Sequence, residues 1–560
     1  MKPQLAALLL CAAVFAQTHH HATPEKASVD LAKLPAPQHF DGIGHSELKI
    51  TTKSPEAQQW FNQGLSLLHC FWDYEALRAF EQAVRLDPDC AMCHWGVSKA
   101  LTLHGGNEEQ AKAEMKKAQE LSSRATDHEQ RYIRASADSQ DKTGDESRKT
   151  FEREMESLID HYPADLEAKL LFALSTNGGY DAKGEPRSGA LYGQAMLRDI
   201  LHDHPDNPAA NHYWIHAVED SHPEWALEAA EKLGKLTPAS GHMVHMPGHI
   251  FYRIGDYERA RQIFLDARRV DLDYMAAQHV SVENDWNYQH NLAYLIAGCA
   301  EQGRYQEACE YARELDNVIK SPGDPEMFRF YVGQLAATSN RLAIRFAKWD
   351  DVIEHPLHFD VPDSELTLAA RSYRDGLVAY ARAMKAADEG HIDDAERHSA
   401  ALDAMLWRIS QEDLKDAAKS TRDRVLKLLG TASVELRGNI AGRKGDMDAA
   451  RTLLEQADQQ ERELGYSEPP QYSRPALEVL GDACIRAGKF DDARNVYKKV
   501  LEQRPHSGWA LYGIAAAWAK QGERDEASKA YREFLDAWSH ADQDLTQVKS
   551  ARAYLAGAAL

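Results

Sequence analysis

The chain has 560 residues, of which 43% are hydrophobic and 27% charged, a length at which chains usually form several domains or a repeat array. Its 87 acidic side chains outnumber 65 basic ones and give a formal net charge of −22, which argues against nucleic acid as a partner. Beyond the first residues no apolar run is long enough to cross a bilayer, so no membrane span is expected.

The first residues have the features of an export signal. Lys2 precedes an apolar run that ends at Phe15, and a small residue then offers a cleavage site before Gln17. We therefore expect residues 1–16 to be a signal peptide and the mature protein to be periplasmic or otherwise secreted. Residues 17–54, which contain several prolines and histidines, are expected to form an extended lead-in segment.

The next part of the chain shows a repeat pattern typical of paired helices. Trp60 is followed four residues later by the small Gly64, then by the pair Ala76 and Phe80 and a closing Pro88. This is the pattern of the tetratricopeptide repeat (TPR). In such repeats small residues let two helices approach, and aromatic residues fill the gap to the next hairpin.

The C-terminal end repeats the pattern most clearly. Three residues recur after 34 positions, the TPR period: Gly488, Ala493 and Tyr497 return as Gly522, Ala527 and Tyr531. We expect an N-terminal TPR array with a His-rich groove over 55–320, degenerate middle hairpins over 321–465, and a C-terminal TPR pair over 466–560. The predicted fold is therefore all-α, a TPR-type helical-hairpin solenoid with a concave groove.

Four segments extend the likeness beyond the repeat itself: Gly42-Ile-Gly-His45, Asp87-Pro-Asp-Cys-Ala-Met-Cys-His-Trp-Gly96, Asn211-His-Tyr-Trp-Ile-His-Ala-Val-Glu219 and His242-Met-Val-His-Met-Pro-Gly-His-Ile250. Together they resemble a family of large exported bacterial TPR proteins whose activity is uncharacterised. The resemblance covers most of residues 40–540. It implies the TPR architecture and supplies no activity and no catalytic residues.

The last of these segments carries the strongest functional signal. At 100° per residue, His242, His245 and His249 fall within about 60° of one another on one face of a helix. In TPR proteins generally, slots 2, 5, 9, 12 and 13 of the first helix of each repeat line the groove. With Gly255 at slot 15, the three histidines take slots 2, 5 and 9. We therefore expect their imidazoles to point away from the core.

Neighbouring hairpins add to this set. His212 and His216 are four residues apart and share a helix face, with Glu219 close to the same face. Further residues at groove-lining slots are Tyr252, Arg253 and His290. Histidines four apart on a helix, with a nearby carboxylate, can hold zinc, copper or iron. Groove histidines that bond a peptide or simply pack are the alternative.

Cys90-Ala-Met-Cys93-His94 matches the motif that attaches c-type haem. The same residues also fit the TPR frame, and members of the resembling family often lack the second Cys and carry Tyr in place of His94. Covalent haem is therefore the less favoured hypothesis. A local disulfide, a thiolate pair and plain helix packing are its alternatives.

These patterns favour an exported TPR scaffold that binds a protein or peptide partner, or a transition-metal ion, in a histidine-lined groove. The alternative is a metal-dependent enzyme that uses the same histidines, with catalytic residues unknown. A c-type haem protein is the third hypothesis. Because fold alone does not determine activity, whether the chain is an enzyme stays open.

Overall fold

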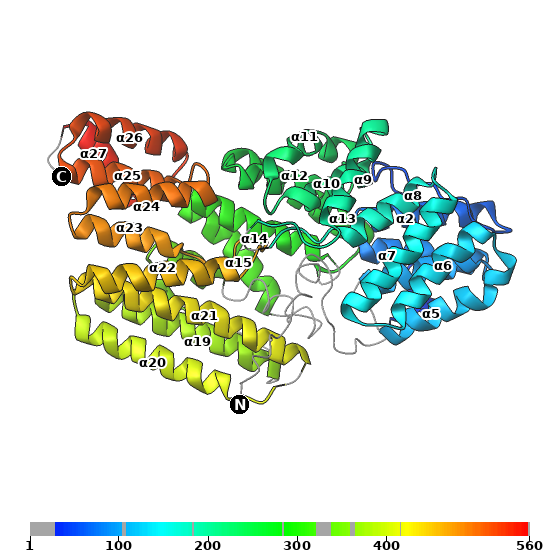
Figure 1. The fold of residues 1–560 in the computed structure, drawn as a ribbon, viewed down its shortest axis with the longest axis horizontal. Helices are drawn as coiled ribbons and strands as arrows, with labels where there is room; N and C mark the ends of the chain where they lie inside the picture. The colour runs from blue at the N-terminus through cyan, green and yellow to red at the C-terminus, as the bar shows by residue number, and fades with distance from the viewer. Residues whose placement is uncertain are drawn as a thin grey trace, which may run out of the picture. The chain divides into compact units, whose positions relative to one another are not determined.

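The computed structural model describes residues 29–103, 108–181, 184–282, 285–320, 338–358, 365–414 and 416–557; the predicted signal peptide lies outside them. The described residues form α-helices joined by turns, with one isolated β-bridge between Tyr180 and Pro186 (Figure 1). The prediction of an all-α chain of helical hairpins is confirmed.

The chain divides into two compact units between Ile250 and Phe251, a point inside helix α12. The N-terminal unit contains η1 (Leu31–Lys33), α2 (Pro55–His69), α3 (Asp73–Leu86), α4 (Ala91–Leu103), α5 (Glu108–Leu121), η2 (Ser122–Arg124), α6 (Asp127–Gln140), α7 (Gly144–His161), α8 (Leu166–Thr176), α9 (Ala190–Asp203), α10 (Pro208–Val218), η3 (Pro223–Ala226), α11 (Leu227–Leu236) and most of α12 (Gly241–Arg253). The C-terminal unit contains α13 (Tyr257–Gln278), α14 (Trp286–Glu301), α15 (Tyr305–Lys320), α17 (Thr338–Arg345), α18 (Trp349–Glu354), α19 (Glu365–Asp388), α20 (Ile392–Ser410), α21 (Asp416–Arg443), α22 (Met447–Glu463), α23 (Ala476–Arg486), α24 (Phe490–Gln503), α25 (Gly508–Gln521), α26 (Arg524–Ala537) and α27 (Thr546–Leu555).

The described part of the lead-in, from Val29 to Ser54, has no helix or strand apart from η1 and lies against α2. Gln63 of α2 accepts a hydrogen bond from the N–H of Phe40 and donates one to the carbonyl of Gln38. The apolar lead-in residues Ile43, Leu48 and Ile50 are buried in the core that α2 to α8 share. The lead-in therefore satisfies its backbone groups on the first hairpin and covers apolar surface there.

Aromatic side chains pack between glycines of neighbouring helices in both units. In the N-terminal unit the ring of Phe80 lies against Gly64 of α2 and Gly96 of α4, where an added Cβ would come within 2.8 and 2.3 Å of ring atoms. In the C-terminal unit Tyr497 occupies the same place between two glycines, Gly481 and Gly513. The small residues of the repeat pattern thus let three consecutive helices share one ring.

Glycine also ends the first helix of each clear repeat. Gly488 has φ +72° and Gly522 has φ +91°, left-handed backbone angles that residues other than glycine rarely adopt. The next residue, Lys489, donates its N–H to the carbonyl of Cys484 at 2.9 Å, and this bond closes the C-terminal end of α23. A left-handed glycine also follows α12, α14, α19 and α21: Gly255, Gly303, Gly390 and Gly445.

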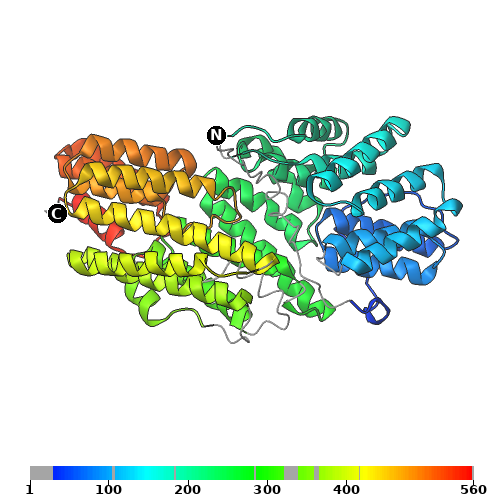
Figure 2. The same cartoon turned by 60° about the horizontal axis from the view of Figure 1, so that its bottom comes forward.

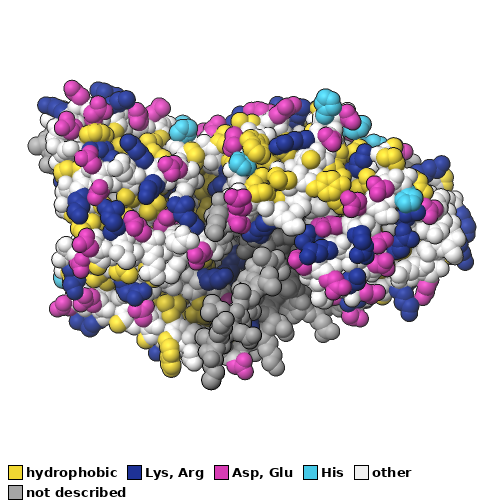
Figure 3. Space-filling view, in the orientation of Figure 1, with side chains coloured by type: hydrophobic (Ala, Val, Ile, Leu, Met, Phe, Trp, Pro, Cys, Tyr) yellow, Lys and Arg dark blue, Asp and Glu magenta, His cyan; other side chains and the backbone are white. Residues whose placement is uncertain are grey.

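Consecutive helices of the C-terminal unit lie side by side. Figures 1 and 2 both show α19 to α26 as a stack of near-parallel rods that alternate in direction. None of the described helices combines the length and apolar character needed to cross a bilayer. On the face drawn in Figure 3, acidic and basic side chains are interspersed, so the net negative charge is not gathered into one patch there.

The packing of Tyr497 predicts the effect of adding one methyl group. A Cβ at Gly513 would lie 2.3 Å from the Tyr497 ring, so Gly513→Ala should lower the free energy of unfolding by about 2 kcal/mol or more. Gly430→Ala in α21 is the control, because its Cβ would meet nothing within 4 Å and should stabilise by about 0.5–1 kcal/mol. Urea unfolding measures both. Equal stability of the two variants would contradict the packing argument.

Glu461 on α22 predicts how the stability of the fold depends on pH. Its side chain is 15% exposed and bonds to the N–H of Ala476, and burial raises its pKa from 4.5 to about 7 despite the nearby charge of Arg504. Since the folded pKa exceeds the unfolded one, this carboxyl costs stability as pH rises from 4.5 through 7.

We therefore expect Glu461→Gln to gain stability relative to the natural chain over this pH interval, by up to about 3 kcal/mol. Calorimetric melting between pH 4.5 and 8 measures the difference. Glu463→Gln, on the same helix but exposed, should show no such trend. A difference for Glu461→Gln that stays flat with pH would refute the interpretation.

Candidate metal centre

The histidines predicted to bind a metal lie on two helices of the N-terminal unit. Helix α10 begins at Pro208, and the side chain of Asn207 caps its first turn. Helix α12 begins at Gly241 and continues through Pro247 to Arg253. Proline has no N–H to give to the preceding turn, but the helix does not break, so all the histidines of α12 are helical and stay one turn apart.

The histidines of α12 are buried, which corrects the expectation that they point away from the core. His242 is 4% exposed, and His245 and His249 are fully enclosed at 0%. From Gly241 to Ile250 every residue is buried except Val244, which is partly buried. The predicted orientation requires one packed face and one open face, but α12 is covered on nearly every side from Gly241 to Ile250.

Three histidines bring their Nε2 atoms together, and we call His212, His216 and His242 the three-histidine group. Nε2 of His212 lies 3.1 Å from Nε2 of His242 and 3.1 Å from Nε2 of His216. All three ligand atoms lie within 4.8 Å of one another. The sequence placed these residues on two adjacent hairpins, and the fold joins them at one point.

The other ring nitrogen of two of these histidines is bonded to an acceptor. Nδ1 of His212 lies 2.8 Å from the backbone carbonyl of His69, and Nδ1 of His216 lies 2.7 Å from Oε1 of Glu219. A carbonyl or an ionised carboxylate only accepts, so each Nδ1 carries the proton. In the neutral ring the lone pair is then on Nε2, the atom that faces the other histidines.

A second pair lies one turn further along α12, and we call His245 and His249 the histidine pair. Their Nε2 atoms are 2.6 Å apart, and Nδ1 of His249 lies 2.6 Å from Oε2 of Glu219. Glu219 was predicted as a metal ligand. Its two oxygens bond to the rings of His216 and His249 and hold both in place.

Burial and charge set the ionisation of these groups. Burial, followed by repulsion from His216, lowers the pKa of His212 well below its ordinary value. Burial also lowers the pKa of His249, although Glu219 opposes the shift. Burial alone would raise the pKa of Glu219, but His249 and His216 hold it far below its usual range. The centre therefore combines an ionised carboxylate with two imidazoles, those of His212 and His249, that favour the neutral, metal-binding form.

Phe71, which the sequence analysis missed, forms an apolar wall. It follows the end of α2 with φ +53°, a left-handed value uncommon outside glycine. Its ring centroid lies 4.5 Å from that of His212, 5.6 Å from His216 and 5.5 Å from His242. No local pattern marks Phe71, because its neighbours come from helices far along the chain.

His69 was also missed, although its carbonyl supports His212. Its own ring is held at both nitrogens, 2.7 Å from the hydroxyl of Tyr213 and 2.7 Å from Oε2 of Glu167. Glu167 in turn lines a cavity of about 600 Å³. The supporting contact to His212 spans 143 residues of sequence, so only the fold could reveal it.

Tyr252 and Arg253, expected to line the groove, pack inside the C-terminal unit. Tyr252 is 8% exposed and contacts Tyr257 and Tyr294 edge-to-face, and burial raises its pKa to about 12. The guanidinium of Arg253 lies 5.5 Å from the ring centre of Tyr466.

His290 also lies in the C-terminal unit, on α14. It is 8% exposed, and its Nε2 lies 3.7 Å from a carboxylate oxygen of Glu468. Its ring packs at right angles to that of Tyr294.

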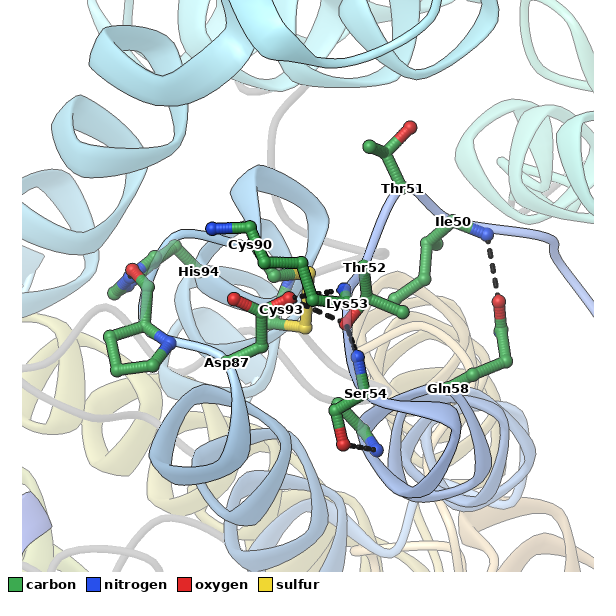
Figure 4. Close-up of a disulfide and its surroundings, with 12 residues drawn as sticks. Ile50, Thr51, Thr52, Lys53, Ser54, Gln58, Asp87, Cys90, Cys93 and His94 are labelled. Carbon is green, nitrogen blue, oxygen red and sulfur yellow. Dashed lines mark hydrogen bonds between the residues drawn. A yellow bond between two sulfur atoms is a disulfide. The ribbon is translucent and has the colours of Figure 1, made fainter.

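Cys90 and Cys93 form a disulfide at the start of α4 (Figure 4). Both are buried, at 1% and 0% exposure, and belong to the core of the N-terminal unit. Asp87, close to this disulfide, accepts hydrogen bonds from Thr52 and Lys53 that tie the lead-in to the turn before α4. These bonds lower the pKa of Asp87 although burial opposes them. The local disulfide, one of the alternatives left open, is the arrangement found.

The motif does not fit haem attachment. Thioether bonds need both sulfurs, which here are joined to each other. His94, the expected iron ligand, is 5% exposed and has both nitrogens engaged, Nδ1 at 2.6 Å from Glu114 and Nε2 at 3.1 Å from the carbonyl of Pro88. The fold thus uses Cys90, Cys93 and His94 for packing.

Comparison with solved structures gives long alignments of low similarity. The crystal structure of yeast Tom70 is 15% identical, with 90% of this chain and 96% of that chain covered and a TM-score of 0.30. The human IFIT1 dimer with PPP-AAAA is 12% identical, with coverages of 87% and 96% and a TM-score of 0.32. At these scores neither alignment supports an argument about this chain. No curated protein matches it.

One family model matches, that of the tetratricopeptide repeat, over residues 485–555. The matched segment runs from the end of α23 to α27 and contains the glycine and tyrosine positions described above. Sequence match and hairpin packing agree that the C-terminal end of this chain is built from tetratricopeptide-type repeats.

Proposed function

We propose that the N-terminal unit binds a transition-metal ion through Nε2 of His212, His216 and His242. The observation that carries the proposal is the convergence of three Nε2 atoms while the Nδ1 atoms of His212 and His216 are bonded to protein acceptors. This is the arrangement in which carboxylates and carbonyls orient metal-binding histidines.

The spacing of the nitrogens suits coordination. Two nitrogens bound to one ion at about 2.1 Å, at tetrahedral or octahedral angles, lie about 3.0–3.4 Å apart. The two Nε2 separations measured from His212 are both 3.1 Å. One ion could therefore contact all three rings with little movement.

A proton is the competing explanation. In the neutral tautomers, the lone pairs of His212 and His216 face each other at 3.1 Å, which is unfavourable unless a cation lies between them. An imidazolium at His216, paired with Glu219, would relieve the repulsion by donating to His212. A metal ion relieves it as well, and also engages His242, which one shared proton cannot do.

The donor set indicates the class of ion. Imidazole nitrogens suit zinc, copper, nickel, cobalt and iron, whereas calcium and magnesium prefer oxygen ligands. Three protein nitrogens leave coordination positions for other ligands, as in catalytic zinc sites. The enzymatic alternative would thus use the same ligands, and metal binding is its first requirement.

The ion would act within an interaction scaffold. TPR arrays present stacked hairpins to protein or peptide partners, and residues 485–555 match that repeat. An ion that joins α10 to α12 would fix two adjacent hairpins of the N-terminal unit. Partner binding by the repeats and metal binding by the histidines are therefore compatible roles.

The test is metal binding by the full chain with His19, His20 and His21 replaced by Ala, because a run of three histidines is a composition typical of metal binding and would confuse the titration. Protein freed of metal and titrated with Zn²⁺ should bind tightly and melt at a higher temperature. His242→Gln should weaken binding at least about 100-fold by removing one of three ligands.

His202→Gln is the matched control, because His202 is exposed on α9 of the same unit. It should bind Zn²⁺ as the parent chain does, and circular dichroism should show that both variants fold. Absence of binding in the parent chain, or equal affinity in the parent and His242→Gln, would refute the proposal in favour of a shared proton.

A further inference from the structure

We infer that the centre holds two transition-metal ions, the second bound by His245 and His249. This inference rests on the proposed function of the three-histidine group and extends it by one site. Its basis is that the Nε2 atoms of the histidine pair face each other at 2.6 Å while both side chains are 0% exposed. An ion about 2.1 Å from each nitrogen would require the two rings to move apart, to a separation of about 3.0–3.4 Å. Two buried imidazoles one helical turn apart point their ligand atoms at the same place.

The pair does not belong to the site of the first ion. Ligand atoms bound to one ion at about 2.1 Å must lie within about 4.2 Å of one another. The three-histidine group lies within 4.8 Å, and neither His245 nor His249 belongs to it. The rings of His242 and His245 stack nearly parallel, with centroids 6.1 Å apart and a 20° interplanar angle. Since imidazole lone pairs lie in the ring plane, such stacked rings direct their nitrogens along separate lines.

Glu219 connects the two sites without being shared as a ligand. Oε1 lies 2.7 Å from Nδ1 of His216, and Oε2 lies 2.6 Å from Nδ1 of His249. Each oxygen thus orients one ring from each site. A carboxylate buried at 1% exposure between two cation sites also reduces the repulsion between their charges.

Within the N-terminal unit, the second ion would be held by two imidazoles and the first by three. Two imidazoles leave at least two coordination positions for water or an oxygen-donor ligand. The second ion should therefore bind more weakly. A simple hydrogen bond, with His245 as donor to His249, is the competing arrangement and predicts no second ion.

Metal stoichiometry tests this inference in the full chain with His19, His20 and His21 replaced by Ala. Titration with Co²⁺, followed by visible absorption and by elemental analysis after gel filtration, should reach two ions per chain. His245→Gln should stop at one ion with the tighter site unchanged. The exposed-site control His202→Gln should keep two.

The outcomes separate the two proposals. One ion in both the parent chain and His245→Gln overturns the second site and leaves the first. No ion in the parent chain overturns both. Loss of both ions in His245→Gln makes His245 a ligand of the first ion and overturns the division into two sites. Melting of the metal-free proteins identifies unfolded variants, and His249→Gln then provides an independent repeat.

Discussion

One buried carboxylate organises the histidine centre. Glu219 ends α10, is 1% exposed, and bonds to His216 on its own helix and to His249 on α12. Burying an unpaired carboxylate costs several kcal/mol, and the two imidazoles offset that cost. The same two bonds decide which nitrogen of each ring carries the proton. The position of Glu219 therefore fixes both the packing and the chemistry of the two helices.

Such an arrangement requires helices that approach closely and stay in place. In the N-terminal unit, α2 to α4 achieve this by setting Phe80 between two glycines, and in the C-terminal unit Tyr497 plays the same part. The end of α2 then supplies the carbonyl of His69 and the ring of Phe71 to the histidines. Repeat packing thus holds the helices in place, and the histidines need only a few further contacts to stay in position.

The sequence predicted the fold well because its strongest signals are local. Gly488 and Gly522 had to adopt left-handed conformations, and Tyr497 had to meet small residues on its neighbours, whatever the rest of the chain did. Helical spacing also identified His242, His245 and His249 as sharing one face of α12.

The sequence failed where distant segments meet. Burial of the α12 histidines depends on helices that cover the supposedly open face, and the roles of His69 and Phe71 depend on contacts more than a hundred residues away. Glu219 was recognised as part of the site, but spacing could not show that its two oxygens contact the imidazoles of His216 and His249. For the Cys90–Cys93 motif, the choice among disulfide, thiolate pair and haem required the positions of the sulfur atoms.

The complete enclosure of His245 and His249 has a kinetic consequence. A surface ion exchanges with solvent as fast as its ligand bonds break, but an ion behind 0% exposed side chains must wait for the helices around it to separate. Such openings are local unfolding events and occur on timescales of microseconds to seconds or slower. For an ion held there, affinity and residence time become separate properties: the imidazoles determine the first, and the stability of the surrounding hairpins determines the second.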